Sequence, residues 1–194
     1  MPTTLPLPPD NYYHVYNMGV NGADLFRSAS NYTHFLRLYE THVDPVVDTY
    51  AWCLLGNHFH LLVRVKEMEE EGGINLSGLV SKKFSNFFNA YAKAPNRQQG
   101  RRGVFFERPF RRKLVDSENY FRQLVVYIHS NPVKHGFTDD FRDYPRSSYG
   151  TILSAKPTRL QRNRVLGWFD GVGNFVDVHR QIIDFDFIEH LIID

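Results

Sequence analysis

Two runs of β-forming residues occupy the middle of the chain, at 46–55 and 58–65, and only Gly56-Asn57 separates them. A two-residue connection of this kind is typical of a β-hairpin with a tight turn. The two strands are therefore expected to pair with each other in an antiparallel sheet. The segments on either side of this hairpin decide the class of fold.

These flanking segments predict a regular order of elements. Strands are expected at 12–18 and 111–115, and helices at 28–43, 76–91 and from 117 to about 130, where Asn131-Pro132 should end the last one. The order matches a β-α-β-β-α-β unit, whose simplest architecture is a ferredoxin-like (RRM-like) antiparallel sheet of the α+β class. Its helices are expected on one face of the sheet, leaving the other face free for a ligand.

The 194 residues are 42% hydrophobic and 15% aromatic, which is ordinary for a folded globule. Residues 1–11 are rich in proline and predict a flexible arm, 12–150 contain the predicted sheet and form one domain, and 151–194 predict a small C-terminal helical extension. That extension is expected to hold helices around 160–169 and 174–192. No run of 18 apolar residues is present, which predicts no membrane span, and the single Cys53 excludes an intrachain disulfide. A cytoplasmic location is expected.

A formal net charge of +2 hides a basic middle segment. Its Lys and Arg side chains suit the neutralisation of phosphates, so the segment predicts a nucleic-acid-binding surface, with solvated surface as the alternative. The candidate DNA-binding residues are Arg101, Arg102, Arg108, Arg111, Arg112 and Lys113. Residues 94–103 are expected to form a polar basic loop. Aromatic residues interleave with the basic ones from 84 to 110, and they can either stack on unpaired bases or pack in the core.

His58 and His60 lie two residues apart on the predicted strand 58–65. Side chains alternate across a strand, so both imidazoles should project from one face and Phe59 from the other. Two neighbouring imidazoles can bind one metal ion. A His-x-His pair also occurs by chance, so a purely structural role stays open.

The helix expected from residue 117 carries a second candidate pair. Tyr127 and Asn131 are i, i+4 neighbours on a stripe beside the apolar one, so a phenol and an amide oxygen can address the same site. The alternative is a tyrosine at the edge of the core.

Taken together, NHFHLLV at 57–63 and YIHSNPVKHGF at 127–137 resemble the single-tyrosine HUH transposases, in particular the REP-associated tyrosine transposases. YYHVYNMGVNGADLF at 12–26 resembles the first strand and loop of that family, GVFFERPFRRKLVDSENYFRQLVVYIHSNPVKHG at 103–136 its later half, and RSSYG at 146–150 its usual end. The resemblance covers residues 12–150. Gly56 and Arg146 depart from it, since family members often have Pro and Trp there.

The resemblance implies a metal-dependent single-stranded DNA endonuclease and strand transferase, acting on hairpin or repeat DNA in transposition. It implies that His58, His60 and Asn131 hold a divalent ion, Mg²⁺ or Mn²⁺. It further implies that Tyr127 attacks the scissile phosphate, which leaves a 5′-phosphotyrosine and a free 3′-OH. Single-stranded or hairpin DNA is the expected partner, and pairing of two chains in a homodimer stays open.

Two other functions are compatible with the sequence. One is a catalytically inactive single-stranded nucleic-acid-binding protein of the same fold, which would be free to lose any of the four site residues that are all present here. The other is a metal enzyme acting on small molecules, against which the basic middle segment argues.

Overall fold

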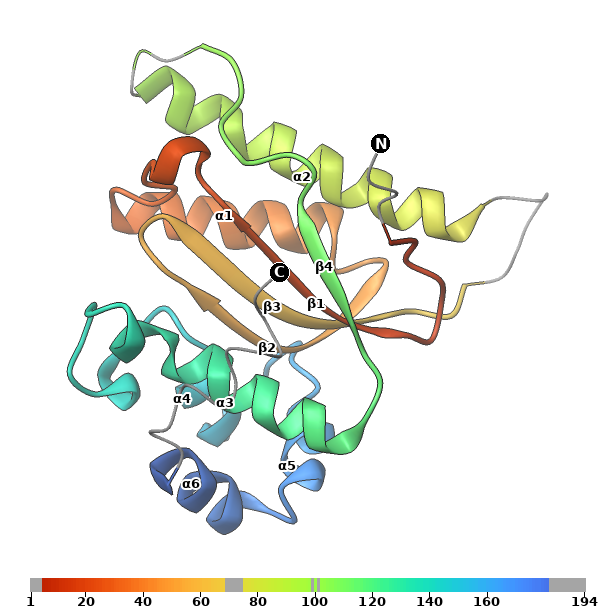
Figure 1. Ribbon diagram of the computed structural model, residues 1–194, viewed down its shortest axis with the longest axis vertical. Coiled ribbons are helices and arrows are strands. Elements are labelled where there is room, and N and C mark those ends of the chain that lie inside the picture. The colour runs from red at the N-terminus through yellow and green to blue at the C-terminus, as the bar shows by residue number, and fades with distance from the viewer. Residues whose placement is uncertain (1–4, 69–74, 99, 101, 182–194) are drawn as a thin grey trace.

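Within residues 5–68, 75–98, 100 and 102–181, which the computed structural model describes, four strands form one antiparallel sheet in the order β2-β3-β1-β4 (Figure 1). They are β1 (Tyr12–Met18), β2 (Val47–Leu54), β3 (His58–Val65) and β4 (Arg111–Val115). The predicted hairpin joins β2 to β3, and β1 pairs with both β3 and β4. The predicted α+β fold with an antiparallel, ferredoxin-like sheet is confirmed.

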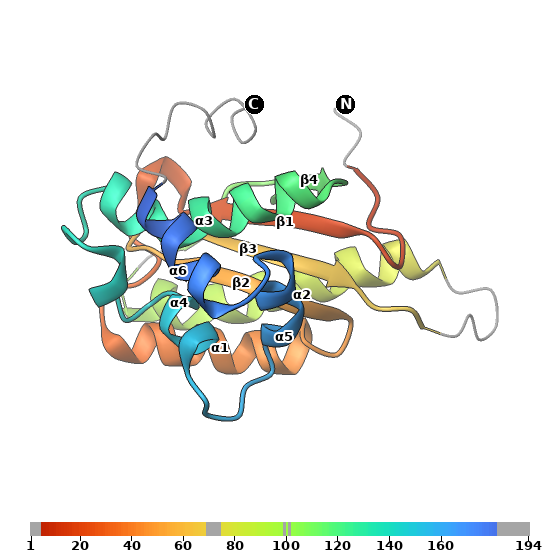
Figure 2. The same ribbon diagram turned by 90° about the horizontal axis from the view of Figure 1, so that it is seen from below.

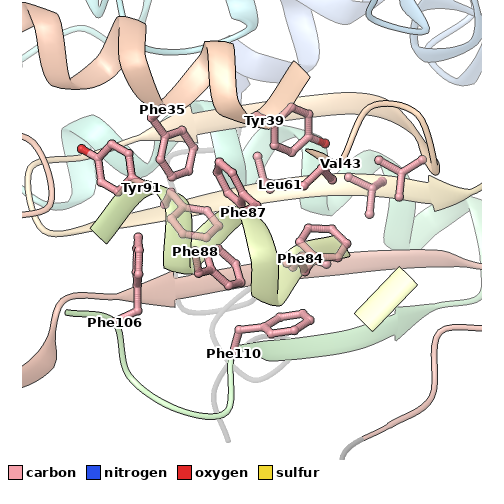
Figure 3. Packing of buried hydrophobic residues seen from close by; sticks show 14 of the residues in the cluster. Phe35, Tyr39, Val43, Leu61, Phe84, Phe87, Phe88, Tyr91, Phe106 and Phe110 are labelled. Atoms are coloured by element: carbon pink, nitrogen blue, oxygen red, sulfur yellow. The ribbon is translucent and has the colours of Figure 1, made fainter. Parts of the chain in front are cut away.

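Helices α1 (Ala29–His42) and α2 (Leu76–Gln98) cover one face of the sheet (Figure 2). Phe59 of β3 points to this face and packs against Phe35 of α1 and Phe88 of α2. Figure 3 shows how aromatic side chains from α1, α2 and the segment before β4 fill the space between these layers. The aromatic residues that interleave with the basic segment are all 7% exposed or less. They therefore pack in the hydrophobic core.

Helix α3 (Glu118–Lys134) lies on the opposite face and packs on β2 and β3 (Figure 2). The prediction that helices cover only one face is wrong for this element. Helix α3 lies there because the second face of the sheet is apolar as well. Ala51 and Leu62 point to that face and would otherwise be exposed. Leu124 and Ile128 of α3 bury that surface. The sheet is thus enclosed between two helical layers.

Two helices extend further than predicted, and each of them continues through a proline. α3 runs through Pro132 to Lys134, and α2 runs through Pro95 into the segment that was predicted as a loop. Proline removes one helical hydrogen bond and crowds the carbonyl four residues earlier. Both prolines lie in the last turn of their helices, so little of either helix follows the disturbance. The extra turn of α3 keeps Asn131 inside a regular helix, one turn after Tyr127.

The C-terminal extension is packed against α3, as Figure 2 shows. Its helices are α4 (Tyr149–Leu153), α5 (Arg162–Trp168) and α6 (Val172–Gln181). Val165, Phe169 and Phe175 are fully buried in the same core cluster as the apolar stripe of α3. The helical character of the extension is confirmed, and the predicted helix 174–192 is present to residue 181, with the remainder outside the described residues.

A buried hydrogen-bonded chain fastens this extension to α3. His129 of α3 is 2.8 Å from His179 of α6 through Nδ1 and Nε2, and its own Nε2 is 2.8 Å from Ser148 Oγ. His179 Nδ1 is 2.7 Å from the carbonyl oxygen of Phe175 and donates to it. All three polar side chains are at most 1% exposed. Each of these nitrogens is therefore satisfied inside the protein.

The N-terminal segment is also packed where it is described. Leu7 is fully buried, and its backbone N–H donates to Ser77 Oγ of α2 at 2.6 Å. The backbone N–H of Asp10 donates to Val65 at the end of β3. Leu7 and Asp10 of the predicted arm therefore contact α2 and the end of β3.

Two 3₁₀ turns, η1 (Val20–Gly22) and η2 (Phe141–Asp143), complete these elements. None of the helices in the described ranges is long and apolar enough to cross a membrane.

Candidate active site

Strand β3 places His58 and His60 on the face of the sheet that α3 covers, with Phe59 on the other face. The centroids of the two imidazole rings lie 5.2 Å apart. Burial is the main cause that lowers the pKa of His58 to about 4, and it lowers the pKa of His60 well below its ordinary value. Both rings are therefore neutral at pH 7, which is the form that ligates a metal ion.

Hydrogen bonds engage the Nδ1 atom of each of these rings. His58 Nδ1 lies 2.7 Å from the amide oxygen of Asn57 and donates to it. His60 Nδ1 lies 2.9 Å from Nε2 of His14, a fully buried residue of β1. Burial lowers the pKa of His14 to about 3, with a smaller contribution from the charge of Lys113, so this ring is neutral as well. A ligating histidine is usually oriented in this way by a bond to its second nitrogen, which leaves Nε2 to face the metal.

Asn131 supplies an unpaired oxygen to the same place. The residue is fully buried, and its Nδ2 donates to the carbonyl oxygen of Tyr127 at 3.1 Å. Its Oδ1 is buried and accepts no hydrogen bond from any described residue. When protonated, the His58 ring can donate to the Asn131 amide, and this side-chain hydrogen bond raises the pKa of His58 against the larger effect of burial. A buried acceptor without a donor is unfavourable by itself and is explained when a cation occupies the space before it.

Tyr127 lies against the histidines within the same chain. Its ring centroid is 5.3 Å from that of His60 and 6.2 Å from that of His14, with the planes nearly perpendicular. The ammonium nitrogen of Lys134 is 5.7 Å from the centre of the Tyr127 ring. Tyr120 is buried too, but it lies about 10 Å earlier along the helix axis.

A cavity of about 320 Å³ opens beside this group. His58, His60 and Tyr127 line it, together with His135 and Glu107, which the sequence did not indicate. The His135 ring lies 4.7 Å from that of His58. No group of three His, Cys, Asp or Glu side chains suited to a metal ion is found in the described part of the chain. A metal site here therefore depends on the amide oxygen of Asn131 as its third protein ligand.

No protein-family model matches the chain. A Haemophilus influenzae protein, provisionally named a REP-associated tyrosine transposase, is 31% identical over 115 residues, which cover 56% of this chain and 62% of that protein. A solved structure of a REP-associated tyrosine transposase bound to a REP hairpin superimposes with a TM-score of 0.62 at 15% identity, over 81% of this chain and 88% of the other. The second comparison shows a shared fold.

The chain is similar to the REP-associated tyrosine transposases in sequence and in fold. The resemblance predicted from its motifs is confirmed, and the chain matches about three fifths of the length of the Haemophilus relative. A bacterial tRNA(His) guanylyltransferase-like protein in complex with GTP gives a TM-score of only 0.45 at 11% identity, over 73% of each chain, and carries no weight here.

The two departures from the transposase pattern have local counterparts in the structure. A Cβ atom at Gly56 would lie 3.2 Å from the ring of Phe137, so a larger residue there would require that ring to move. The guanidinium group of Arg146 lies 4.8 Å from the centre of the Tyr32 ring. Neither position contributes a side chain to the cavity beside Tyr127.

The six predicted DNA-binding cations do not all lie on one surface of this chain. Arg111 lines the cavity beside Tyr127 and is 3.9 Å from Glu107, and Lys113 points to the same face of β4 as Arg111. Arg112 points to the α2 side because side chains alternate along β4. Arg102 and Arg108 are exposed before the strand. Arg101 lies outside the described residues.

Proposed function

We propose that this chain is a metal-dependent single-stranded DNA endonuclease and strand transferase that acts on hairpin or repeat DNA in transposition through a 5′-phosphotyrosine intermediate. The observation that carries the proposal is a cluster of four buried or half-buried side chains within one chain. It consists of two neutral imidazoles, an amide oxygen without a donor and a phenol whose ring lies 5.3 Å from that of His60. The name of the Haemophilus relative and the hairpin-bound structure support the class of substrate.

The donor set fits a divalent cation such as Mg²⁺ or Mn²⁺. The Nε2 atoms of His58 and His60 and the Oδ1 atom of Asn131 would hold it, and the two nitrogen ligands favour Mn²⁺. When bound, such an ion supplies Lewis-acid polarisation of the scissile phosphate. Asn57 and His14 hold the two rings in the orientation that this requires.

The chemical step assigned to Tyr127 is a transesterification. The phenolic oxygen attacks the phosphorus of a phosphodiester, a bond forms between them, and the bond from phosphorus to the 3′ oxygen breaks. The phenol releases its proton to solvent, and the departing 3′ oxygen takes up a proton to become a 3′-OH. Lys134 lies near the Tyr127 ring, where its positive charge favours the negative charge that develops on the phenolic oxygen.

The phosphotyrosine bond allows the strand to be rejoined without ATP. A 3′-OH that attacks the phosphotyrosine restores a phosphodiester, because one ester bond is exchanged for another of similar energy. Since Tyr127 lies against His60 of its own chain, the proposed site is complete in a monomer.

A denaturing gel tests the proposal. The protein is incubated with labelled hairpin oligonucleotides that carry single-stranded flanks, with and without Mn²⁺. We expect a metal-dependent covalent adduct from the parent and from Tyr120→Phe, and none from Tyr127→Phe, because that substitution removes only the attacking oxygen. Adduct formation by Tyr127→Phe would contradict the assignment. Absence of any adduct from the parent, together with retained hairpin binding, would favour the inactive binding protein.

A further inference from the structure

Arg111 lies on the same face of the sheet as the candidate active site. It is directly opposite Tyr16 in the pairing of β4 with β1, and Tyr16 is directly opposite His60 in the pairing of β1 with β3. Figure 1 shows β1 between the other two strands. Residues that face each other across an antiparallel pair project from the same side of the sheet. His60, Tyr16 and Arg111 therefore form one row across it.

All three residues of this row line the cavity of about 320 Å³ beside Tyr127. The ring of Tyr16 is stacked beside that of His60, with 5.8 Å between the two centroids. Neighbouring strands are about 4.8 Å apart, so the backbone of Arg111 is roughly 10 Å from that of His60. A phosphate held next to Tyr127 would therefore lie within reach of the guanidinium group of Arg111.

Arg111 gives this cavity a fixed positive charge. Among the described residues that line the cavity, it is the only lysine or arginine. The imidazoles of His58 and His60 are neutral, and burial lowers the pKa of His135 as well. Arg112, the next residue of β4, lines a separate cavity of about 760 Å³. Because a guanidinium group stays protonated in proteins, Arg111 is the side chain suited to meet a phosphate here.

Glu107 orients this guanidinium group from the wall of the same cavity. Its carboxylate oxygen is 3.9 Å from Nη2 of Arg111. The backbone N–H of Glu107 donates to the carbonyl oxygen of Met18 at 3.0 Å, and its own carbonyl accepts from Asn17 Nδ2 at 3.2 Å, so Glu107 is fixed to the end of β1. The side chain of Arg111 is 51% exposed, and such an exposed ion pair contributes little to stability. Replacement of Arg111 should therefore leave the fold intact.

We propose that Arg111 is a further catalytic residue, whose guanidinium group binds the non-bridging oxygens of the scissile phosphate. The inference rests on the proposed function for the reaction. While the bond from phosphorus to the phenolic oxygen of Tyr127 forms and the bond to the 3′ oxygen breaks, Arg111 keeps all its protons and forms no covalent bond. Its planar fork matches two phosphate oxygens, and a fixed charge aimed at them stabilises the transition state.

Single-turnover kinetics separates this role from DNA binding. The rate of adduct formation is measured with Mn²⁺ and with saturating protein in excess over a labelled hairpin. Lys82→Ala is the matched control, because Lys82 is an exposed cation of α2, on the other side of the sheet. We expect Arg111→Ala to react about 100-fold more slowly than the parent, as the loss of one preorganised donor allows. Arg111→Lys, which keeps the charge without the fork, should have an intermediate rate, and Lys82→Ala the rate of the parent.

A hairpin with a methylphosphonate at the scissile position tests whether the lost rate belongs to the charge of the phosphate. This linkage has a methyl group in place of one non-bridging oxygen and carries no negative charge. Parent and Arg111→Ala should react with it at rates that differ by less than about threefold, because the charge that Arg111 stabilises is gone. If neither protein reacts with it, guanidinium chloride is added to Arg111→Ala on the ordinary hairpin. A faster reaction would then support the inference, and an unchanged rate would contradict it.

Thermal unfolding and calorimetric titration with Mn²⁺ should give the same result for the parent and the variants, and Arg111→Lys decides the outcome if Arg111→Ala is not folded. Three results would overturn the inference: an Arg111→Ala protein as fast as Lys82→Ala, a loss of rate explained by weaker Mn²⁺ binding, or an equal loss with both linkages. Each of them leaves the proposed function in place, because the parent still forms the adduct. Absence of any adduct from the parent would refute the proposed function, and the catalytic role of Arg111 with it.

Discussion

Replacement of Asn131 by leucine distinguishes a role of this residue as a metal ligand from a purely structural role. In the metal-free protein, Asn131→Leu removes a buried acceptor that has no donor, which should return about 1–3 kcal/mol. It also removes the bond from Nδ2 to the carbonyl of Tyr127, which should cost about 0.5–1.5 kcal/mol. The two side chains have the same number and branching of heavy atoms, so leucine keeps the shape of the asparagine side chain while its methyl groups take somewhat more space. The metal-free variant should therefore lie between about 0.5 kcal/mol less stable and about 2.5 kcal/mol more stable than the parent.

Saturating Mn²⁺ should reverse this order. At a concentration of 100 times its dissociation constant, a ligand adds about 2.7 kcal/mol to the stability of the protein that binds it. The parent should gain this amount, and Asn131→Leu should gain much less because it has lost one of three ligands. For a chain of this size, each kcal/mol shifts the melting temperature by about 2–4 °C.

Calorimetric melting curves with and without Mn²⁺ measure both effects, and Asn131→Asp is the control that keeps a ligating oxygen. The reasoning is refuted if Asn131→Leu destabilises the metal-free protein by more than about 2 kcal/mol and Mn²⁺ stabilises the parent and the variant equally. Asn131 would then be a structural residue.

Three further outcomes follow from the buried histidines. His14→Phe keeps a buried ring but removes the hydrogen bond to His60 Nδ1, so Mn²⁺ affinity measured by calorimetric titration should fall about 10–100-fold. An unchanged affinity would show that His14 does not orient His60. His179→Phe leaves His129 Nδ1 without its hydrogen-bond partner, so the free energy of unfolding in urea should fall by about 1–3 kcal/mol. No loss of stability would show that the hydrogen bond between the two histidines does not fasten α6 to α3. His14, His58 and His179 have pKa values that burial lowers to about 3–4, so the unfolded chain binds more protons than the folded one below about pH 6.5. Stability should therefore fall as the pH is lowered from about 6.5 toward 4, and urea midpoints that stay level over this range would contradict the assigned neutral state.

The sequence predicted the strands well because their signals are local. Strand 58–65 follows from its β-forming residues and from the Gly-Asn turn, and its two histidines share one face as predicted. The i, i+4 relation of Tyr127 and Asn131 also holds, because α3 is regular across both residues. These features need only the geometry of one element.

Features that depend on how elements meet were beyond the same reasoning. The contact between His14 and His60 depends on the register between β1 and β3. In that register Tyr16 lies directly opposite His60, and His14 lies two residues earlier on β1, on the same face of the sheet. The position of α3 depends on which sheet face lacks cover, and an apolar stripe alone does not specify that face. Arg111 and Arg112 are neighbours in the sequence, yet the alternation of β4 sends them to different cavities.

Identification of the residue that carries DNA tests the central claim most directly. After reaction of the parent with a hairpin oligonucleotide and Mn²⁺, the protein is digested with protease and nuclease, and peptides that retain a nucleotide are sequenced by mass spectrometry. The account predicts a nucleotide joined through its 5′ phosphate to Tyr127, together with a released DNA fragment that ends in a 3′-OH. A nucleotide on another residue, or cleaved DNA with a free 5′ phosphate and no modified peptide, would contradict it.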